Sequence, residues 1–113
     1  CMLDSLDMRH SDRLKVLQAC SDCASQKIVI VHGTDTMPET AKMLGHAALG
    51  KTIVLTGAMI PYEFDDSDAF FNFGFAVAAG LLSCGVYISM NGRVFEWDRV
   101  RKNRQEGRFE ETE

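Results

Sequence analysis

A hydroxyl and a carboxylate stand side by side in the sequence, shortly after a run of β-branched residues. They belong to Thr34 and Asp35, and Gly33 before them allows the backbone to turn sharply. Such a pair at the end of a buried strand can serve acyl transfer, in which an activated hydroxyl attacks a carbonyl carbon. The same two residue types also cap helices, so the pair alone leaves both uses open.

The capping role has another candidate in the same loop. Thr36 is followed three residues later by Glu39, which is the capping-box pattern, and Pro38 is tolerated in a first helical turn. We therefore expect Thr36 to begin the helix, which leaves Thr34 and Asp35 available for chemistry.

Three short apolar runs predict buried strands, at residues 27–31, 52–56 and 85–90. Asn91-Gly92 after the third run is a strong hairpin signal. Helical segments between the runs make this an α/β pattern. We expect an open, mostly parallel sheet with helices on both faces, in the three-layer flavodoxin-like or Rossmann-like manner, with a hairpin near the C-terminus.

The first helix is predicted to start at Ser11. Its apolar spacing should turn Leu14 and Leu17 towards the core, with Val16 and Cys20 beside them.

The two later helices differ in character. The one that starts at Thr36 should end at Gly45 or Gly50, whereas Ala69–Leu82 is apolar nearly all round and needs cover on both sides. One sheet face cannot hide the four phenylalanines in its first seven residues. We expect a homodimer or homotetramer whose interface they cross or border, unless another part of the chain covers them. They are Phe70, Phe71, Phe73 and Phe75.

Composition excludes several classes of protein. The chain has 113 residues, 46% of them hydrophobic, and a net charge of −4, which fits one globular domain and gives no positive field for nucleic acid. The uncharged stretch between Asp68 and Arg93 is interrupted by polar residues and glycines, so we expect no membrane span and no membrane partner. Four scattered cysteines favour a reducing, cytoplasmic setting.

Cys20 and Cys23 have the spacing of a redox or half-zinc motif. No second close pair of cysteines or histidines accompanies them, and no strand precedes them. We therefore expect no metal site.

Four segments together resemble the N-terminal domain of the bacterial-type L-asparaginase (asparaginase/glutaminase) family. They are HGTDTMPETAKML, TGAMIP, DSDAFFNFGFAVAAG and GVYISMNGRVFEWDRVRKN, and they extend over nearly the whole chain. The resemblance implies an amidohydrolase that uses two threonines, a lysine and an aspartate, with no metal or organic cofactor. Long members of this family assemble as dimers or tetramers.

The resemblance assigns catalytic roles to Thr34, Asp35 and Lys102. An amide is a poor electrophile with a poor leaving group, so a hydroxyl, a base and a cationic or donor group must act together on it. Lys102 can act as the base only where its surroundings favour the uncharged amine. Asp35 would orient that lysine and also meet the ammonium group of a substrate.

The resemblance assigns substrate binding to three further residues. Ala58 matches a position whose backbone faces the substrate amide. Ser5 matches a serine that holds the α-carboxylate, and Asp4 lies beside it in the same segment. Asp68 and Asn72 match a recurrent D-x-x-x-N pattern that we interpret as structural.

The T-G-G-T-I run, which carries the primary nucleophilic threonine in the family, is not in this sequence, and we expect no C-terminal domain. We expect a single N-terminal-type domain at residues 1–113 without its first strand and nucleophile loop, inactive alone. With that segment, it should release ammonia from the side-chain amide of L-asparagine or a similar small ω-amide. The alternatives are a non-catalytic ligand-binding or assembly module, and a hydrolase for a different substrate.

Overall fold

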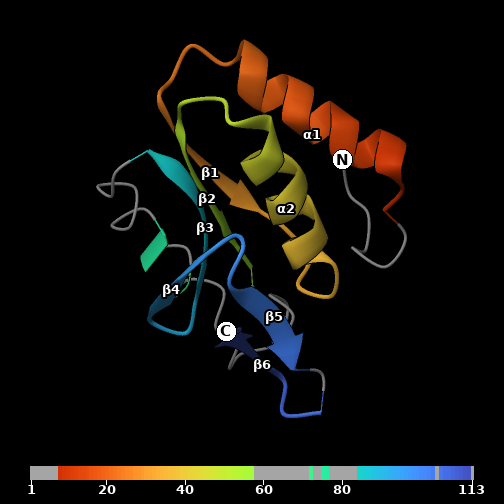
Figure 1. Ribbon diagram of the computed structural model, residues 1–113, viewed down its shortest axis with the longest axis vertical. Coiled ribbons are helices and arrows are strands. Elements are labelled where there is room, and N and C mark those ends of the chain that lie inside the picture. The colour runs from red at the N-terminus through yellow and green to blue at the C-terminus, as the bar shows by residue number, and fades with distance from the viewer. Residues whose placement is uncertain (1–7, 58–71, 73–74, 77–83, 104, 113) are drawn as a thin grey trace.

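The computed structural model describes residues 8–57, 72, 75–76, 84–103 and 105–112 (Figure 1). In chain order, these residues form α1 (His10–Asp22), β1 (Lys27–Val31), α2 (Met37–Ala47), β2 (Thr52–Thr56), β3 (Gly85–Met90), β4 (Arg93–Glu96), β5 (Val100–Asn103) and β6 (Arg108–Glu111).

The main sheet has the strand order β1-β2-β3-β4. The first two pairings are parallel, and β3 pairs with β4 in antiparallel fashion. The turn between β3 and β4 places Asn91 at φ 52° and Gly92 at φ 75°, the positive pair that a tight hairpin turn requires. The prediction of an α/β fold with a mostly parallel sheet and a hairpin is confirmed.

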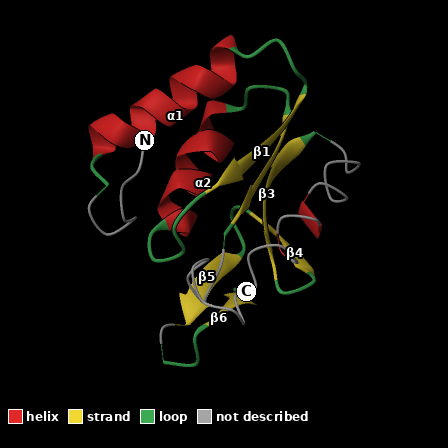
Figure 2. Ribbon diagram, turned by 180° about the vertical axis from the view of Figure 1, so that it is seen from behind, coloured by secondary structure: helices red, strands yellow, loops and turns green. Residues whose placement is uncertain are grey.

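One face of the sheet carries the larger core. Ile53, Leu55 and Ile88 point towards α2 and are fully buried there with Met37 and Leu44. The helix α2 lies against the strands, and α1 lies outside it (Figures 1 and 2). Alternation along each strand therefore sends every second side chain into this layer.

The opposite face is covered at least in part by helical residues. Val54 is buried there with Ala76, and Val29 and Tyr87 pack against them. Residues 72, 75 and 76 are helical. The rest of the predicted helix 69–82, with Phe70, Phe71 and Phe73, lies outside the described residues.

Residues 27–31 form the predicted strand β1, but the expectation that this strand is buried is wrong. Its central residues are only half-buried, and Val31 is 68% exposed. The same expectation holds for β2, where all five residues are buried. The difference follows from position, since β1 forms an edge of the described sheet and β2 lies inside it.

The helix α1 begins one residue before the predicted Ser11. The backbone N–H of Arg9 donates to Asp12 Oδ2 at 2.9 Å, which satisfies a donor ahead of the first turn. Leu14 was predicted to be buried but is 46% exposed. Because α1 packs mainly on α2, only a narrow stripe of its surface reaches the core.

Lys51 caps the far end of α1. Its Nζ donates to the carbonyl oxygens of Cys20, at 2.7 Å, and Cys23. A cation at a helix C-terminus complements the negative end of the helix dipole. Among the described residues, neither helix is long and apolar enough to cross a membrane.

The helix α2 has the predicted N-cap residue but a different end. Thr36 precedes its first turn, yet its side chain makes no capping hydrogen bond there. Neither Gly45 nor Gly50 ends the helix. It ends at Ala47, and Ala48 adopts the left-handed conformation at φ 49°. Gly45 lies inside the helix because the Trp97 ring packs directly on it.

The charged C-terminal tail forms a hairpin that the sequence analysis did not predict. β5 and β6 pair in antiparallel fashion, with Lys102 opposite Phe109. Val100 and Phe109 are buried in the main core and anchor the hairpin to the sheet. This anchoring holds Lys102 near the carboxyl ends of the parallel strands.

Candidate active site

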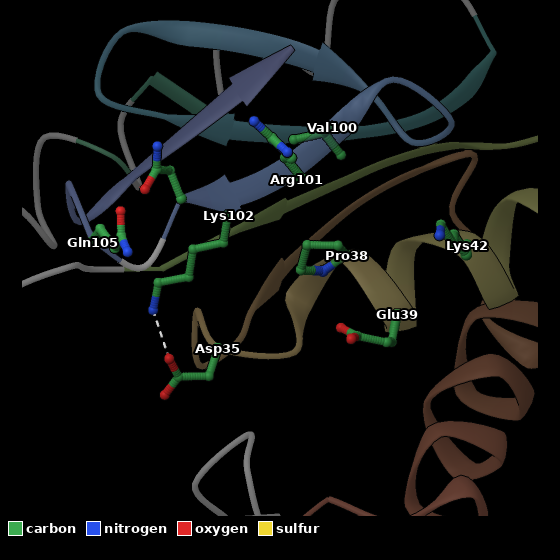
Figure 3. Close-up of a pocket in the computed structure, with 9 residues that line it drawn as sticks. Asp35, Pro38, Glu39, Lys42, Val100, Arg101, Lys102 and Gln105 are labelled. Carbon is green, nitrogen blue, oxygen red and sulfur yellow. Dashed lines mark hydrogen bonds and ion pairs between the residues drawn. The ribbon is translucent and has the colours of Figure 1, made fainter. Parts of the chain in front are cut away.

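The side chains of Thr34, Asp35 and Lys102 meet at the carboxyl end of β1. Lys102 Nζ donates to Thr34 Oγ1 at 2.9 Å and to Asp35 Oδ1 at 2.7 Å. Figure 3 shows Lys102 extending from β5 towards the Asp35 carboxylate. The structure therefore brings together the three residues to which the sequence analysis assigned catalytic roles, and those roles stay predictions.

The three side chains are partly withdrawn from water. Thr34 is 9% exposed, and the exposed fractions of the Lys102 and Asp35 side chains are 11% and 33%. A partly buried ion pair is screened less by solvent than a surface pair, and its geometry is better defined. Because one third of the Asp35 side-chain surface is exposed to solvent, a ligand can still contact this residue.

A cavity of about 560 Å³ opens beside this cluster. It lies between the first turns of α2 and strand β5, and Asp35 and Lys102 form part of its wall together with Glu39 and Lys42 (Figure 3). This volume is in the range of small-molecule sites. The charged lining favours a polar ligand.

The loop that carries Thr34 is held at its base by His32. The His32 backbone N–H donates to the Thr56 carbonyl at 2.8 Å. Its ring is buried, with Nδ1 2.5 Å from the Gly33 carbonyl oxygen and Nε2 2.9 Å from Thr40 Oγ1. Burial lowers the pKa of His32, more than the Gly33 carbonyl raises it.

Asn72 joins the ends of two neighbouring strands. Its Nδ2 donates to the Gly57 carbonyl at 2.8 Å, and its Oδ1 accepts from the Asn91 backbone N–H at 2.9 Å. Asn72 is fully buried. It therefore fixes the two loops that follow β2 and β3, next to the loop that follows β1.

The predicted substrate-binding residues Asp4, Ser5 and Ala58 lie outside the described residues. Gly57, directly before Ala58, is buried, and a Cβ there would lie 2.2 Å from the His32 carbonyl oxygen. The loops after β1 and β2 thus touch closely where Gly57 lies.

The sequence analysis gave no role to His32, Thr40 or Arg13. Thr40 lies eight residues after His32, on the turn of α2 that faces back to the loop, and Arg13 comes from α1. For His32, the one local signal of burial is its place in the sequence, directly after an apolar strand and before Gly33. Nothing local points to Arg13.

Cys20 is buried, whereas Cys23 and Cys84 are exposed, and all three are free thiols. Burial raises the pKa of the Cys20 thiol, and Cys23 raises it further. In the part of the chain that the structure describes, no group of three or more histidine, cysteine or acidic side chains could hold a metal.

The sequence matches the family described as asparaginase, N-terminal, over residues 1–109. This match covers nearly the whole chain. The chain belongs to the asparaginase family.

Curated and solved asparaginases agree with this assignment. L-asparaginase 1 of Escherichia coli K12 is 36% identical in an alignment of 83 positions that covers 70% of this chain and 25% of the relative. The protein of Escherichia coli O157:H7 gives the same values. A crystal structure of a probable cytoplasmic L-asparaginase from Campylobacter jejuni superposes with a TM-score of 0.82 at 30% identity. The superposition covers 88% of this chain and 34% of that one. The chain thus spans about a quarter to a third of these asparaginases.

Proposed function

We propose that, together with a segment that carries the T-G-G-T-I motif, the protein is an asparaginase-like amidohydrolase that cleaves the side-chain amide of L-asparagine or a similar small ω-amide and releases ammonia. The observation that carries the proposal is the double contact of Lys102 Nζ with Thr34 Oγ1 and Asp35 Oδ1. Membership of the asparaginase family and the similarity to L-asparaginases support the amide substrate.

Each of the three groups has a distinct task in this proposal. Lys102 donates to both neighbours in the structure, so it must first lose a proton to act as a base. As the uncharged amine it accepts the proton of the Thr34 hydroxyl, while Thr34 Oγ1 takes the proton of the threonine in a T-G-G-T-I segment, whose oxygen bonds to the amide carbon. As the C–N bond breaks, the Lys102 ammonium group returns a proton, through Thr34, to the departing nitrogen. Asp35 orients the lysine through the 2.7 Å contact. Its exposed carboxylate surface also offers an acceptor to the substrate ammonium group.

The remaining substrate contacts are assigned to Ala58, through its backbone, to Ser5, at the α-carboxylate, and to Asp4, which lies beside Ser5 in the sequence. The proposal includes no metal or organic cofactor. We also infer a cytoplasmic location, which the free thiols Cys20, Cys23 and Cys84 favour.

Binding of L-aspartate, the product of asparagine hydrolysis, tests the site by nuclear magnetic resonance on the labelled chain. We expect saturable shifts around Thr34 and Lys102. Asp35→Asn should weaken binding roughly 10- to 100-fold, because a charge-assisted hydrogen bond to the ammonium group is lost.

Glu106→Gln is the matched control, since Glu106 is an exposed carboxylate that pairs with Arg108 on the β5–β6 hairpin. Its affinity for L-aspartate should equal that of the wild type. Equal affinity of Asp35→Asn and wild type, or no binding by either, would contradict the assignment of this site.

A further inference from the structure

A chain of hydrogen bonds links α1 and α2 to the loop that carries Thr34. Arg13 Nε donates to Thr40 Oγ1 at 3.1 Å, and Thr40 Oγ1 lies 2.9 Å from His32 Nε2. On the other side of the same ring, His32 Nδ1 lies 2.5 Å from the Gly33 carbonyl oxygen.

The chemistry of the two ends fixes where the protons lie. A carbonyl oxygen can only accept, so His32 Nδ1 must carry a hydrogen to bond with Gly33. A guanidinium N–H can only donate, so Thr40 Oγ1 accepts from Arg13. In a neutral ring whose Nδ1 carries the hydrogen, Nε2 can only accept, and the Thr40 hydroxyl then donates to it. With a neutral ring, all three bonds run in one direction, from Arg13 to the Gly33 carbonyl.

We propose that Arg13 and Thr40 are positioning residues that hold His32 as the neutral, Nδ1-protonated tautomer and thereby orient the Gly33–Thr34 peptide. This positioning role rests on the proposed function, in which the Thr34 hydroxyl is a reacting group.

The bond to Gly33 matters because of what that carbonyl is joined to. The Gly33 carbonyl and the Thr34 N–H belong to one planar peptide unit, so a ring that fixes the oxygen also fixes the start of Thr34. Glycine has the widest choice of backbone conformations, and this peptide would otherwise turn freely. Thr34 Oγ1 then stays at 2.9 Å from Lys102 Nζ.

Two charged side chains act on the His32 ring from the helices packed against it. Arg13, from α1, opposes a positive charge on the ring, and Glu39, from α2, favours one. Burial has the largest effect and also opposes the charge, so the net effect lowers the pKa of His32. Burial and the hydrogen-bond directions both favour the neutral ring.

The tautomer can be measured without any substrate. In long-range 15N–1H spectra of the labelled chain, we expect His32 Nδ1 to resonate as a protonated nitrogen and Nε2 as an acceptor. This pattern should persist to about pH 6, where a histidine of ordinary pKa is largely charged. A proton on Nε2 at that pH, in either the other neutral tautomer or the charged ring, would overturn the proposal.

Two variants test the residues that hold the ring. In Arg13→Met, the titration midpoint of His32 should rise, because a neighbouring cation is gone and the Thr40 hydroxyl can then accept from Nε2. In Thr40→Val, the Nε2 resonance should move to the position of a nitrogen that accepts no hydrogen bond, whereas Thr40→Ser should keep the wild-type position. Unchanged spectra in Arg13→Met and Thr40→Val would refute their positioning roles.

The effect on the site is read as ammonia release from L-asparagine by a longer polypeptide that includes the T-G-G-T-I segment. Thr40→Val should lower kcat roughly 10- to 100-fold with little change in KM, whereas the single variant Thr40→Ser should have a kcat near that of the wild type. A normal kcat in Thr40→Val would overturn the positioning role. Absence of activity in the wild type would count against the proposed function alone, because the spectra test the His32 tautomer independently.

Discussion

Lys102 and Thr34 are 68 residues apart in the sequence, and their side chains meet at 2.9 Å. The contact depends on two anchors that differ in kind. The loop of Thr34 is fixed by polar bonds around His32, whereas the hairpin of Lys102 is fixed by the buried side chains of Val100 and Phe109. Changes in either anchor should therefore disturb the same pair of atoms.

Asn72→Leu should destabilise the protein strongly. Leucine fills a similar volume but leaves the Gly57 carbonyl and the Asn91 N–H without their partner, and each such group costs about 1–3 kcal/mol when buried. We expect a loss of about 2–5 kcal/mol in the free energy of unfolding, measured with urea. Asn103→Leu, at a part-buried position, should lose less than about 1 kcal/mol. Equal losses for the two variants would contradict the role of Asn72.

Gly45→Ala should lower the free energy of unfolding because the added methyl group would clash with Trp97. The added Cβ would lie 2.2 Å from the Trp97 ring, and such overpacking costs about 1–3 kcal/mol. In a Trp97→Leu background the clash is relieved, and the better helix propensity of alanine, about 1 kcal/mol, should remove the cost. Urea unfolding of the four proteins of this cycle measures the difference. The same cost in both backgrounds would show that Trp97 is not its source.

Stability should fall as the pH drops below about 6.5, the ordinary pKa of histidine. The pKa of His32 is lowered in the folded protein, so between that value and the ordinary one the unfolded chain binds more protons. Stability from the neutral ring is therefore complete above the unfolded pKa and is lost as the pH falls through the folded one. Urea unfolding at about pH 7 and about pH 5.5 should show a smaller difference for His32→Gln than for the wild type. If His32→Gln and the wild type lost the same free energy of unfolding between these pH values, a group other than His32 would cause the acid sensitivity.

Assembly into a homodimer or homotetramer is expected from the phenylalanine-rich segment. Phe70, Phe71 and Phe73 lie outside the described residues, and Phe75 is partly exposed. Burying a phenylalanine side chain contributes roughly 1.5–3 kcal/mol of favourable free energy. Association that buries several exposed phenylalanines is therefore favoured. Light scattering at tens of micromolar should give a multiple of the 12.6 kDa chain mass. A monomer under these conditions would rule out this assembly.

The parallel strands could be predicted from local sequence alone. β1, β2 and β3 have the predicted bounds, because β-branched runs between loop residues indicate strands wherever they are buried. The hairpin β5–β6 could not be predicted in this way. Its residues are mostly charged, and it depends on two buried side chains, Val100 and Phe109, that lie nine positions apart.

Thr34 and Asp35 can be singled out only in part from local sequence. The capping-box pattern predicts that Thr36 caps α2, but the Thr36 side chain makes no capping hydrogen bond to the first turn of that helix. What engages Thr34 and Asp35 is Lys102, and that long-range contact is a product of the tertiary fold. Only the family resemblance singled out Lys102 among the charged residues of the tail.

The most direct test of the account is ammonia release from L-asparagine by three polypeptides that carry the T-G-G-T-I segment before this chain. They are the wild type, Lys102→Met and the control Arg108→Met, which removes an exposed cation on β6. We expect Lys102→Met to lose roughly 10²- to 10⁴-fold in kcat, as for a general base, and Arg108→Met to match the wild type. The 113-residue chain by itself should give negligible turnover. Wild-type turnover by Lys102→Met, or binding without hydrolysis by the longer wild-type polypeptide, would contradict the proposed catalytic site.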